Sequence, residues 1–235
     1  TFQYQKLIVE TQIVEIIKIL EINKNLRTLR KSLRTLRLNK IQYLSKLKNM
    51  LAINFQPFPI LESERLVLRR LKDSDAPEVY KIRSSPERMR FVPRPILQNE
   101  GEALAMIQMM NSKIDENTDI NWGVCLKNSD KIIGFMGFYR VQPESYRTEI
   151  GYMILPEYDG KGYVSEAVTT MLNYAFNTVG FHSVEAVIDP NNFGSARVLE
   201  KNGFRKEAHF IENFFWNNEF IDSVHYGILK REFVK

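Results

Sequence analysis

The stretch EIGYMILPEYDGKGYVSEAV, residues 149–168, joins a strand-like run, a glycine-containing loop and an amphipathic helix. The run from Ile150 to Leu155 ends at a proline, and Gly160 and Gly162 follow before the helical pattern begins. Glycine adopts backbone angles that side chains forbid and lets the main chain approach a ligand closely. A helix that begins after such a loop has unpaired N–H groups and a positive dipole end at its first turn. The element therefore predicts a binding site for a diphosphate.

The composition is that of a globular protein with a core, since 44% of the 235 residues are apolar. Its single cysteine, Cys125, excludes an internal disulfide and a cysteine-rich zinc site. Cys125 lies between Val124 and Leu126 in a strand-like run, so we interpret it as a buried inert thiol and not as a covalent acyl carrier. No apolar run reaches membrane-spanning length and no signal peptide is evident, so we expect a soluble, cytoplasmic protein without membrane partners.

No metal site is expected, because the three histidines (His182, His209 and His225) lack the spacing of metal ligands.

The net charge of +5 conceals an uneven distribution of charge along the chain. Residues 1–49 contain 11 Lys or Arg and three Glu, a balance of +8, whereas the remaining 22 basic and 25 acidic residues give −3. A nucleic-acid partner for the whole protein is therefore not supported by composition.

The basic segment 1–49 has a helical pattern of its own, and the pentapeptide LRTLR occurs at 26–30 and again at 33–37, one heptad later. One interpretation is a coiled-coil or docking helix, with a basic face that could tether the protein to an anionic surface. The other is an extension outside the active domain, such as translated upstream sequence, because a domain-like sequence starts at Met50. We divide the chain into this extension, 1–49, and an active domain, 50–235.

The active domain is predicted to fold in the order βααβββαβαββ, as a mixed sheet with helices on both faces. The predicted helices are 73–84, 99–113, the segment after Gly162, and 195–201, and the predicted strands are 65–71, 122–126, 132–141, 148–155, 183–188, 204–210 and 220–229. The last two strands are expected to form a hairpin.

Four ordered motifs resemble the GNAT N-acetyltransferase superfamily, in its RimJ/RimL-type branch of ribosomal-protein N-terminal acetyltransferases. They are LESERLVLRRL (61–71), IIGFMGF (132–138), EIGYMILPEYDGKGYVSEA (149–167) and DPNNFGSARVLEKNGF (189–204). The likeness covers about residues 57–233. It implies the GNAT acyl-CoA N-acyltransferase fold, an α/β (α+β) fold whose mixed, mostly antiparallel sheet has two splayed parallel strands, here 148–155 and 183–188.

The resemblance also implies that acetyl-CoA is the co-substrate. The family signature Q/R-x-x-G-x-G/A matches the window Glu157–Gly162 in its glycines but has Glu in first place. By resemblance, the main chain of Met153 and Leu155 pairs with the pantetheine arm, the N–H groups of residues 158–163 hold the diphosphate, and Asn192 bonds the pantetheine. The binding set is then Met153, Leu155, Tyr158, Asp159, Gly160, Lys161, Gly162, Tyr163, Asn192 and Ser195. Lys161 either adds charge to the phosphates or is a solvated loop lysine.

Two residues are candidates for catalysis. Glu149 is the candidate general base, acting through water, and positioned proton transfer accelerates reactions by roughly 10²–10⁴. The alternative is a carboxylate at a strand end that pairs with Arg147 or another cation. Ser195 is the candidate acid for the departing thiolate, because the N-x-x-S spacing from Asn192 matches the branch. The alternative is that Ser195 only caps a helix.

The resemblance implies direct transfer of the acetyl group to a primary amine in a ternary complex. We expect a protein or peptide N-terminal α-amine, whose pKa of about 7.7–8.0 is lower than the 10.4 of lysine. A polyamine, amino acid or drug as acceptor, or an acyl-CoA-binding module without turnover, are the alternatives. The helices 73–84 and 99–113 and the aromatic tip Phe214–Trp216 are expected to flank the acceptor entrance, with core packing or a dimer contact as the alternative role for the tip. The protein is expected to be a monomer or homodimer.

Overall fold

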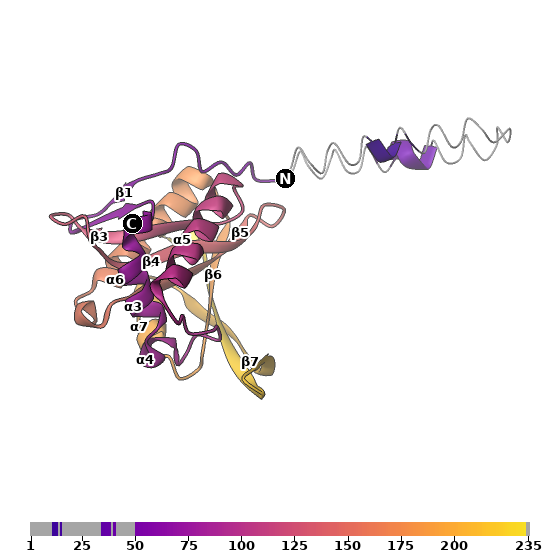
Figure 1. Cartoon of the computed structure of the whole chain (residues 1–235). Coiled ribbons are helices and arrows are strands. Elements are labelled where there is room, and N and C mark those ends of the chain that lie inside the picture. Colours follow the sequence, from indigo (N-terminus) through magenta and orange to yellow (C-terminus); the bar gives the residue numbers. More distant parts are fainter. Residues whose placement is uncertain (1–10, 14, 16–33, 39, 41–49, 234–235) are drawn as a thin grey trace. The chain divides into compact units, whose positions relative to one another are not determined.

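The computed structural model describes residues 11–13, 15, 34–38, 40 and 50–233 (Figure 1). The chain divides into two compact units, Thr1–Met50 and Leu51–Lys235. In the first unit, residues 11–13, 15, 34–38 and 40 are helical and Met50 is not, and the rest of the predicted extension lies outside the described residues. No described helix is long and apolar enough to cross a membrane.

The second unit contains one eight-stranded sheet in the order β1-β2-β3-β4-β5-β6-β8-β7. All neighbouring strands are antiparallel except β5 and β6, which are parallel. The predicted mixed sheet is therefore confirmed. Its strands are β1 (Leu61–Glu62), β2 (Leu66–Arg69), β3 (Ile120–Leu126), β4 (Ile132–Gln142), β5 (Arg147–Ile154), β6 (Ser183–Ile188), β7 (Arg205–Trp216) and β8 (Glu219–Leu229).

Five α-helices are described in the second unit (Figure 1): α3 (Ala76–Arg83), α4 (Pro86–Met89), α5 (Glu100–Asp115), α6 (Tyr163–Asn173) and α7 (Phe193–Lys201). The sequence did not predict α4. Short 3₁₀ turns cover Asp73–Asp75, Pro156–Tyr158 and Lys230–Glu232, and a π-helical turn, Tyr174–Val179, continues α6. At the start of α3, the carboxylate of Asp75 accepts from Arg69 at 2.8 Å and makes no cap bond to the helix.

The helices cover both faces of the sheet. One apolar cluster joins α3 and α5 to sheet residues such as Phe135 and Leu155. The other joins α6 and α7 to residues such as Phe138 and Val184. Trp122 of β3 is fully buried in the second cluster, and its indole N–H donates to the carbonyl oxygen of Pro59 at 2.8 Å. This bond fixes the chain that precedes β1 against the sheet, since a buried indole N–H needs an acceptor.

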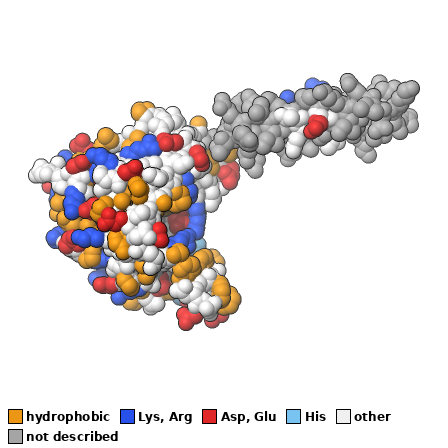
Figure 2. Space-filling view, in the orientation of Figure 1, with side chains coloured by type: hydrophobic (Ala, Val, Ile, Leu, Met, Phe, Trp, Pro, Cys, Tyr) orange, Lys and Arg blue, Asp and Glu red, His pale blue; other side chains and the backbone are white. Residues whose placement is uncertain are grey.

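The predicted hairpin is confirmed and is longer than expected, because β7 continues to Trp216. Its turn, Asn217-Asn218, has φ values of 49° and 64°, the left-handed region that asparagine tolerates and that tight hairpin turns need. The hairpin, yellow in Figure 1, projects beyond the helices, and apolar side chains gather over it in Figure 2. Its exposed large apolar residues are Phe210, Ile211, Phe214, Phe215 and Phe220. In the predicted aromatic tip, Phe214 and Phe215 are therefore exposed, Trp216 is half-buried, and none of the three belongs to the core.

Gly134 of β4 provides a test of how closely β4 and β5 must approach. A Cβ atom at this position would collide with the carbonyl oxygen of Met153 and lie 2.9 Å from the Cα atom of Ile154. We expect Gly134→Ala to lower the free energy of unfolding by about 2 kcal/mol or more, as overpacking against backbone does. Gly194→Ala is the control, because its Cβ would meet only the Asn192 side chain at 3.8 Å. Urea unfolding should show the first variant destabilised and the second unchanged or stabilised; equal effects would contradict the close approach.

Candidate active site

The strands β5 and β6 pair over only three residues and then separate. Their partners are Arg147 with Ser183, Thr148 with Val184, and Glu149 with Glu185. Beyond this point β5 runs on to Ile154 and β6 to Ile188 without further pairing to each other. The space between the two unpaired portions is called the β5–β6 gap below. One edge of β5 therefore presents free main-chain groups to the gap, and an extended ligand could add to it as a strand does.

The main-chain groups that face the gap differ from those predicted. The N–H of Leu155 donates to the carbonyl oxygen of Ile133 on β4 at 2.8 Å, and its carbonyl accepts from Tyr158. The carbonyl of Met153 also points at β4, against Gly134. Because hydrogen-bonding direction alternates along a strand, the groups of Tyr152 and Ile154 are directed at the gap. The sequence alone does not give the register of β5 with β4, which decides which residues of β5 face the neighbouring strand.

The loop after β5, residues 158–163 and called the diphosphate loop below, is open to a ligand. Gly160 and Gly162 have φ values of 69° and 81°, and no heavy atom lies within 4 Å of the position of a Cβ on Gly160. Among the described residues, no acceptor is found for the N–H groups of residues 160–163. Helix α6 begins at Tyr163, and Gly162 provides no side-chain cap. Free N–H groups and the positive helix end together fit an anion such as a diphosphate.

A cation missed by the sequence reading, Arg65, borders this loop. Its Nη1 donates to the carbonyl oxygen of Lys161 at 3.1 Å, and its guanidinium lies 4.5 Å from the ring centroid of Tyr163. Glu166 of α6 pairs with Arg65 at 2.6 Å and fixes it there. Arg65 lies within the motif at 61–71, but its position beside the loop depends on contacts about a hundred residues apart, which no local pattern indicates.

The other predicted loop side chains have partners of their own. The ammonium of Lys161 lies 5.4 Å from the ring centroid of Tyr158, and the rings of Tyr158 and Tyr163 are 6.2 Å apart. Asp159 pairs with Arg88 of α4. This pairing offsets a negative charge that would otherwise oppose an anion in the loop.

Glu149 lies at the point where the β5–β6 gap opens. Its carboxylate pairs with Arg140 at 2.5 Å and not with Arg147, which instead pairs with Glu185 at 2.6 Å. Its side chain is 17% exposed. Burial raises the pKa of Glu149 above its ordinary value, the charge of Glu185 raises it further, and Arg140 opposes the rise. A carboxylate with a raised pKa is a stronger base than an exposed one.

Ser195 lies on the other side of β5. Its hydroxyl is 2.8 Å from the hydroxyl of Tyr152, and the helix cap is provided by Asn192, which accepts from the N–H of Ser195 at 3.1 Å. The alternative in which the Ser195 hydroxyl serves only as the cap is therefore wrong. Burial raises the pKa of Tyr152 to about 12, so both hydroxyl groups keep their protons at neutral pH. Tyr152 is not singled out from the sequence, because its contact with Ser195 joins residues 43 positions apart.

Cys125 is buried, and burial raises the pKa of its thiol, which supports the interpretation as an inert residue. The charge of Arg69 opposes this rise of the pKa but does not cancel it. In the described part of the chain no group of three or more His, Cys, Asp or Glu could hold a metal ion. His209 is paired with Asp222 at 2.7 Å.

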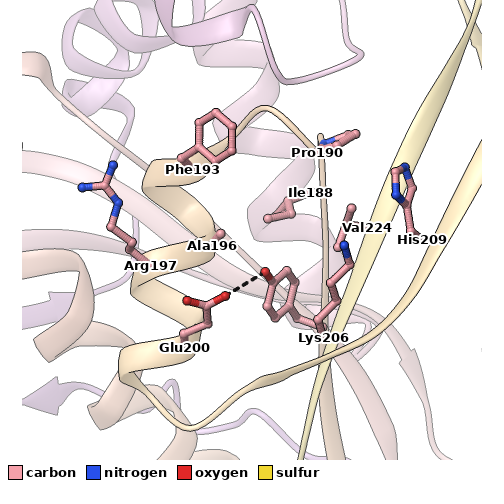
Figure 3. A pocket seen from close by; sticks show the side chains of 10 residues that line it. Ile188, Pro190, Phe193, Ala196, Arg197, Glu200, Lys206, His209 and Val224 are labelled. Atoms are coloured by element: carbon pink, nitrogen blue, oxygen red, sulfur yellow. Dashed lines mark hydrogen bonds between the residues drawn. The ribbon is translucent and has the colours of Figure 1, made fainter.

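A separate cavity of about 380 Å³ lies between α7 and the β7–β8 hairpin (Figure 3). Arg197 and Glu200 of α7 and Lys206 and His209 of β7 are among the residues that line it, and Glu200 accepts from Tyr226 at 3.1 Å. Because the sheet order is β5-β6-β8, strand β6 separates this cavity from the β5–β6 gap. Neither Glu149 nor Ser195 lines it.

The comparisons with known proteins agree with this geometry. Residues 65–205 match the family model described as "Acetyltransferase (GNAT) domain". The chain belongs to the GNAT acetyltransferase family. It is 33% identical over 173 residues to YoaA of Bacillus subtilis, named an uncharacterised N-acetyltransferase, across 74% of this chain and 98% of that protein. A GNAT-family acetyltransferase structure from Bacillus anthracis has a TM-score of 0.67 and 29% identity, covering 74% of this chain and all of that one.

More distant relatives differ in the acceptor that their names state. Spermidine N(1)-acetyltransferase of Vibrio cholerae is 22% identical across 73% of this chain and 97% of that protein. A structure of RimL, a ribosomal-protein alpha-N-acetyltransferase in complex with coenzyme A, has a TM-score of 0.65 and 18% identity, covering 73% of this chain and 98% of that one. The latter likeness shows the fold alone. The GNAT fold and the acetyltransferase class predicted from the sequence are confirmed.

The ion pair of Glu149 with Arg140 leads to a measurable shift. We expect Arg140→Gln to raise the pKa of Glu149 further, because burial and the charge of Glu185 would then act without the opposing cation. Carboxyl-carbon NMR titration of Glu149 should show its midpoint at higher pH in the variant. Arg205→Gln, which removes an arginine paired with Glu232 and Glu207, is the control and should leave that midpoint in place. An unchanged midpoint in Arg140→Gln would contradict the pairing.

Proposed function

We propose that the protein transfers the acetyl group of acetyl-CoA to a primary amine, with a protein or peptide N-terminal α-amine as the favoured acceptor. The observation that carries this proposal is the end of the β5–β6 pairing at Glu149, which opens an unpaired strand edge between the diphosphate loop and a candidate base. Bound acetyl-CoA would supply an activated thioester. The names of YoaA and its relatives support the reaction class.

The diphosphate loop is the proposed site for the coenzyme's diphosphate. Its free N–H groups at residues 160–163, the first turn of α6 and the nearby Arg65 all favour an anion there. Tyr152 and Ile154 replace Met153 and Leu155 as the proposed main-chain partners of the pantetheine arm, because the latter pair bond to β4. Asn192 is retained as a proposed contact through the nitrogen of its side-chain amide, since the side-chain oxygen already caps α7.

Glu149 is proposed to accept a proton from the incoming amine, directly or through a water. An ammonium has no free electron pair, so the amine must lose a proton before it attacks the thioester carbonyl. Burial raises the pKa of Glu149 above its ordinary value, and the charge of Glu185 adds to the rise, so the carboxylate is a stronger base than an exposed one. Arg140, which bonds the carboxylate at 2.5 Å, opposes the rise.

Ser195 is proposed to donate a proton to the departing thiolate, with Tyr152 as its partner. The two hydroxyl groups are 2.8 Å apart, so a proton that leaves Ser195 can be replaced from Tyr152. Glu149 shares its face of β5 with Gly151 and Met153, while Tyr152 projects from the other face. The proposed base and acid therefore lie on opposite faces of the sheet at the β5–β6 gap, so that one can serve the incoming amine and the other the departing thiolate.

Binding is testable without knowledge of the acceptor. We expect calorimetry to show binding of acetyl-CoA to the wild-type chain, and Gly162→Val to weaken it at least tenfold, because a β-branched residue at φ 81° distorts the loop. Thermal unfolding should show the fold retained in the variant. Asn173→Ala, at the exposed far end of α6, is the control and should bind within about twofold of the wild type. A wild-type chain that is folded and does not bind acetyl-CoA would end the proposal.

The two catalytic roles predict different pH signatures. Glu149→Gln should lower kcat/KM by roughly 10²–10⁴, most strongly below neutral pH, where the free amine is scarce. The rise of the wild-type rate with pH through the Glu149 pKa should disappear. Ser195→Ala should lower kcat while leaving the Kd for acetyl-CoA unchanged, and Tyr152→Phe should do so more weakly. Thiol release measured between pH 5.5 and 9 tests both; a pH profile unchanged in Glu149→Gln would remove it as the base.

A further inference from the structure

Arg83, the last residue of α3, is a buried cation without an acidic partner. Only 8% of it is exposed. Its Nη2 donates to the carbonyl oxygen of Pro95 at 3.3 Å, and its Nη1 lies 3.9 Å from the sulfur of Met153. Its Nε has no hydrogen-bond partner among the described residues, and in the same part of the chain no Asp or Glu pairs with it.

Such an arrangement is costly for the isolated protein. Burial lowers the pKa of Arg83, yet a guanidinium keeps its proton in proteins. A buried charge without a partner destabilises a fold, and proteins retain one where a ligand supplies the opposite charge. The planar guanidinium also matches the geometry of a carboxylate or phosphate through two parallel hydrogen bonds.

Arg83 lies on the same face of the sheet as the proposed base. Met153, which its guanidinium contacts, projects from the face of β5 that carries Glu149. Tyr139 is the β4 partner of Glu149. Burial raises the pKa of Tyr139, the charge of Arg83 opposes this rise, and the charge of Glu149 adds to it, so both residues act on the same ring. Arg94, exposed and without an acidic partner in the described residues, acts electrostatically on both Arg83 and Glu149. Two unpaired cations therefore border the site where the amine must be placed.

The coenzyme does not account for these cations. Its diphosphate is assigned to residues 158–163, beyond the far end of β5 from Glu149, where Arg65 and Lys161 are available. Its pantetheine arm is uncharged. A polyamine would be repelled by Arg83 and Arg94, because like charges in a partly desolvated site oppose binding.

We propose that Arg83, with Arg94 at the entrance, binds a carboxylate of the acceptor, so that the acceptor carries a carboxylate a few bonds from the amine that is acetylated. This inference rests on the proposed function and narrows its acceptor. Two sources share the required chemistry: the α-carboxylate of a free amino acid, and the side chain of an acidic residue at the start of a peptide.

Matched acceptor pairs test this with the full chain. Thiol release from acetyl-CoA is measured with free L-amino acids against their amides, with peptides that begin with Asp or Glu against those that begin with Asn or Gln, and with spermidine. We expect the carboxylate member of one pair to have a kcat/KM about 10–100-fold higher, the effect of a hydrogen-bonded charge. The pair that shows the difference identifies the source of the carboxylate.

Substitution then tests whether Arg83 causes the preference for carboxylate acceptors. Arg83→Met should abolish this preference by raising KM for the carboxylate acceptor, with the Kd for acetyl-CoA unchanged. Arg83→Lys should retain part of the preference. Without acceptor, the Tm of Arg83→Met should be unchanged or higher than that of the wild type, whereas a purely structural arginine would lower it. Arg90→Met, which removes an exposed arginine stacked on Phe91, is the control and should keep the preference.

The outcomes separate this inference from the proposed function. If amides or spermidine are turned over as fast as the acceptors that carry a carboxylate, the proposed role of Arg83 is overturned. The acetyltransferase proposal then stays in place. Turnover of no amine by a chain that binds acetyl-CoA would remove the proposed function, and the acceptor inference with it. The wild-type comparison alone decides between these results, so it does not depend on how any variant folds.

Discussion

The short parallel pairing of β5 with β6 is the constraint on which the rest of the site depends. Three residue pairs hold the strands together, and the pairing ends at Glu149 and Glu185. A longer pairing would close the gap and satisfy the main-chain groups of Tyr152 and Ile154 internally. The unpaired edge faces the proposed site of the coenzyme, and β5 remains bonded to β4 along its other edge. Because Gly134 of β4 has no side chain, β4 approaches β5 closely. This contact holds β5 along one edge while its other edge stays unpaired.

The gap also divides the proposed chemistry between two environments. On one face, Glu149 is buried beside Glu185 and held by Arg140, which balances the rise of its pKa. On the other, the hydroxyl groups of Ser195 and Tyr152 form a neutral pair with their protons retained. A base that must ionise and an acid that must stay protonated need different surroundings, and a sheet opened at one point places each on its own face.

Local features of the site were predictable from the sequence, and long-range ones were not. The glycines at 160 and 162, the helix after them and the strand 183–188 follow from periodicity and backbone freedom, which act over a few residues. The resemblance placed Glu149 and Ser195 in order along the chain. The direction of the main-chain groups of Met153 and Leu155 depends on the register with β4, which no pattern within β5 encodes. The ion pair of Glu149 likewise depends on a bulge that places Arg140, at φ 49°, across the hairpin.

Net charge was the least informative sequence property, because pairing decides which charges act on a ligand. The second unit carries an acidic excess, yet four acidic residues around the site are each paired with an arginine: Asp159 with Arg88, Glu149 with Arg140, Glu185 with Arg147, and Glu166 with Arg65. These pairs cancel most of the negative potential at short range. Arg83, without an acidic partner in the described residues, then dominates the acceptor side. Buried Arg83 and exposed Arg94 are the two arginines of the proposed acceptor side without an acidic partner in the described residues, which is why the acceptor inference assigns an anion there. Glu149 remains free to exchange a proton, because its partner Arg140 is largely exposed and weakened by solvent.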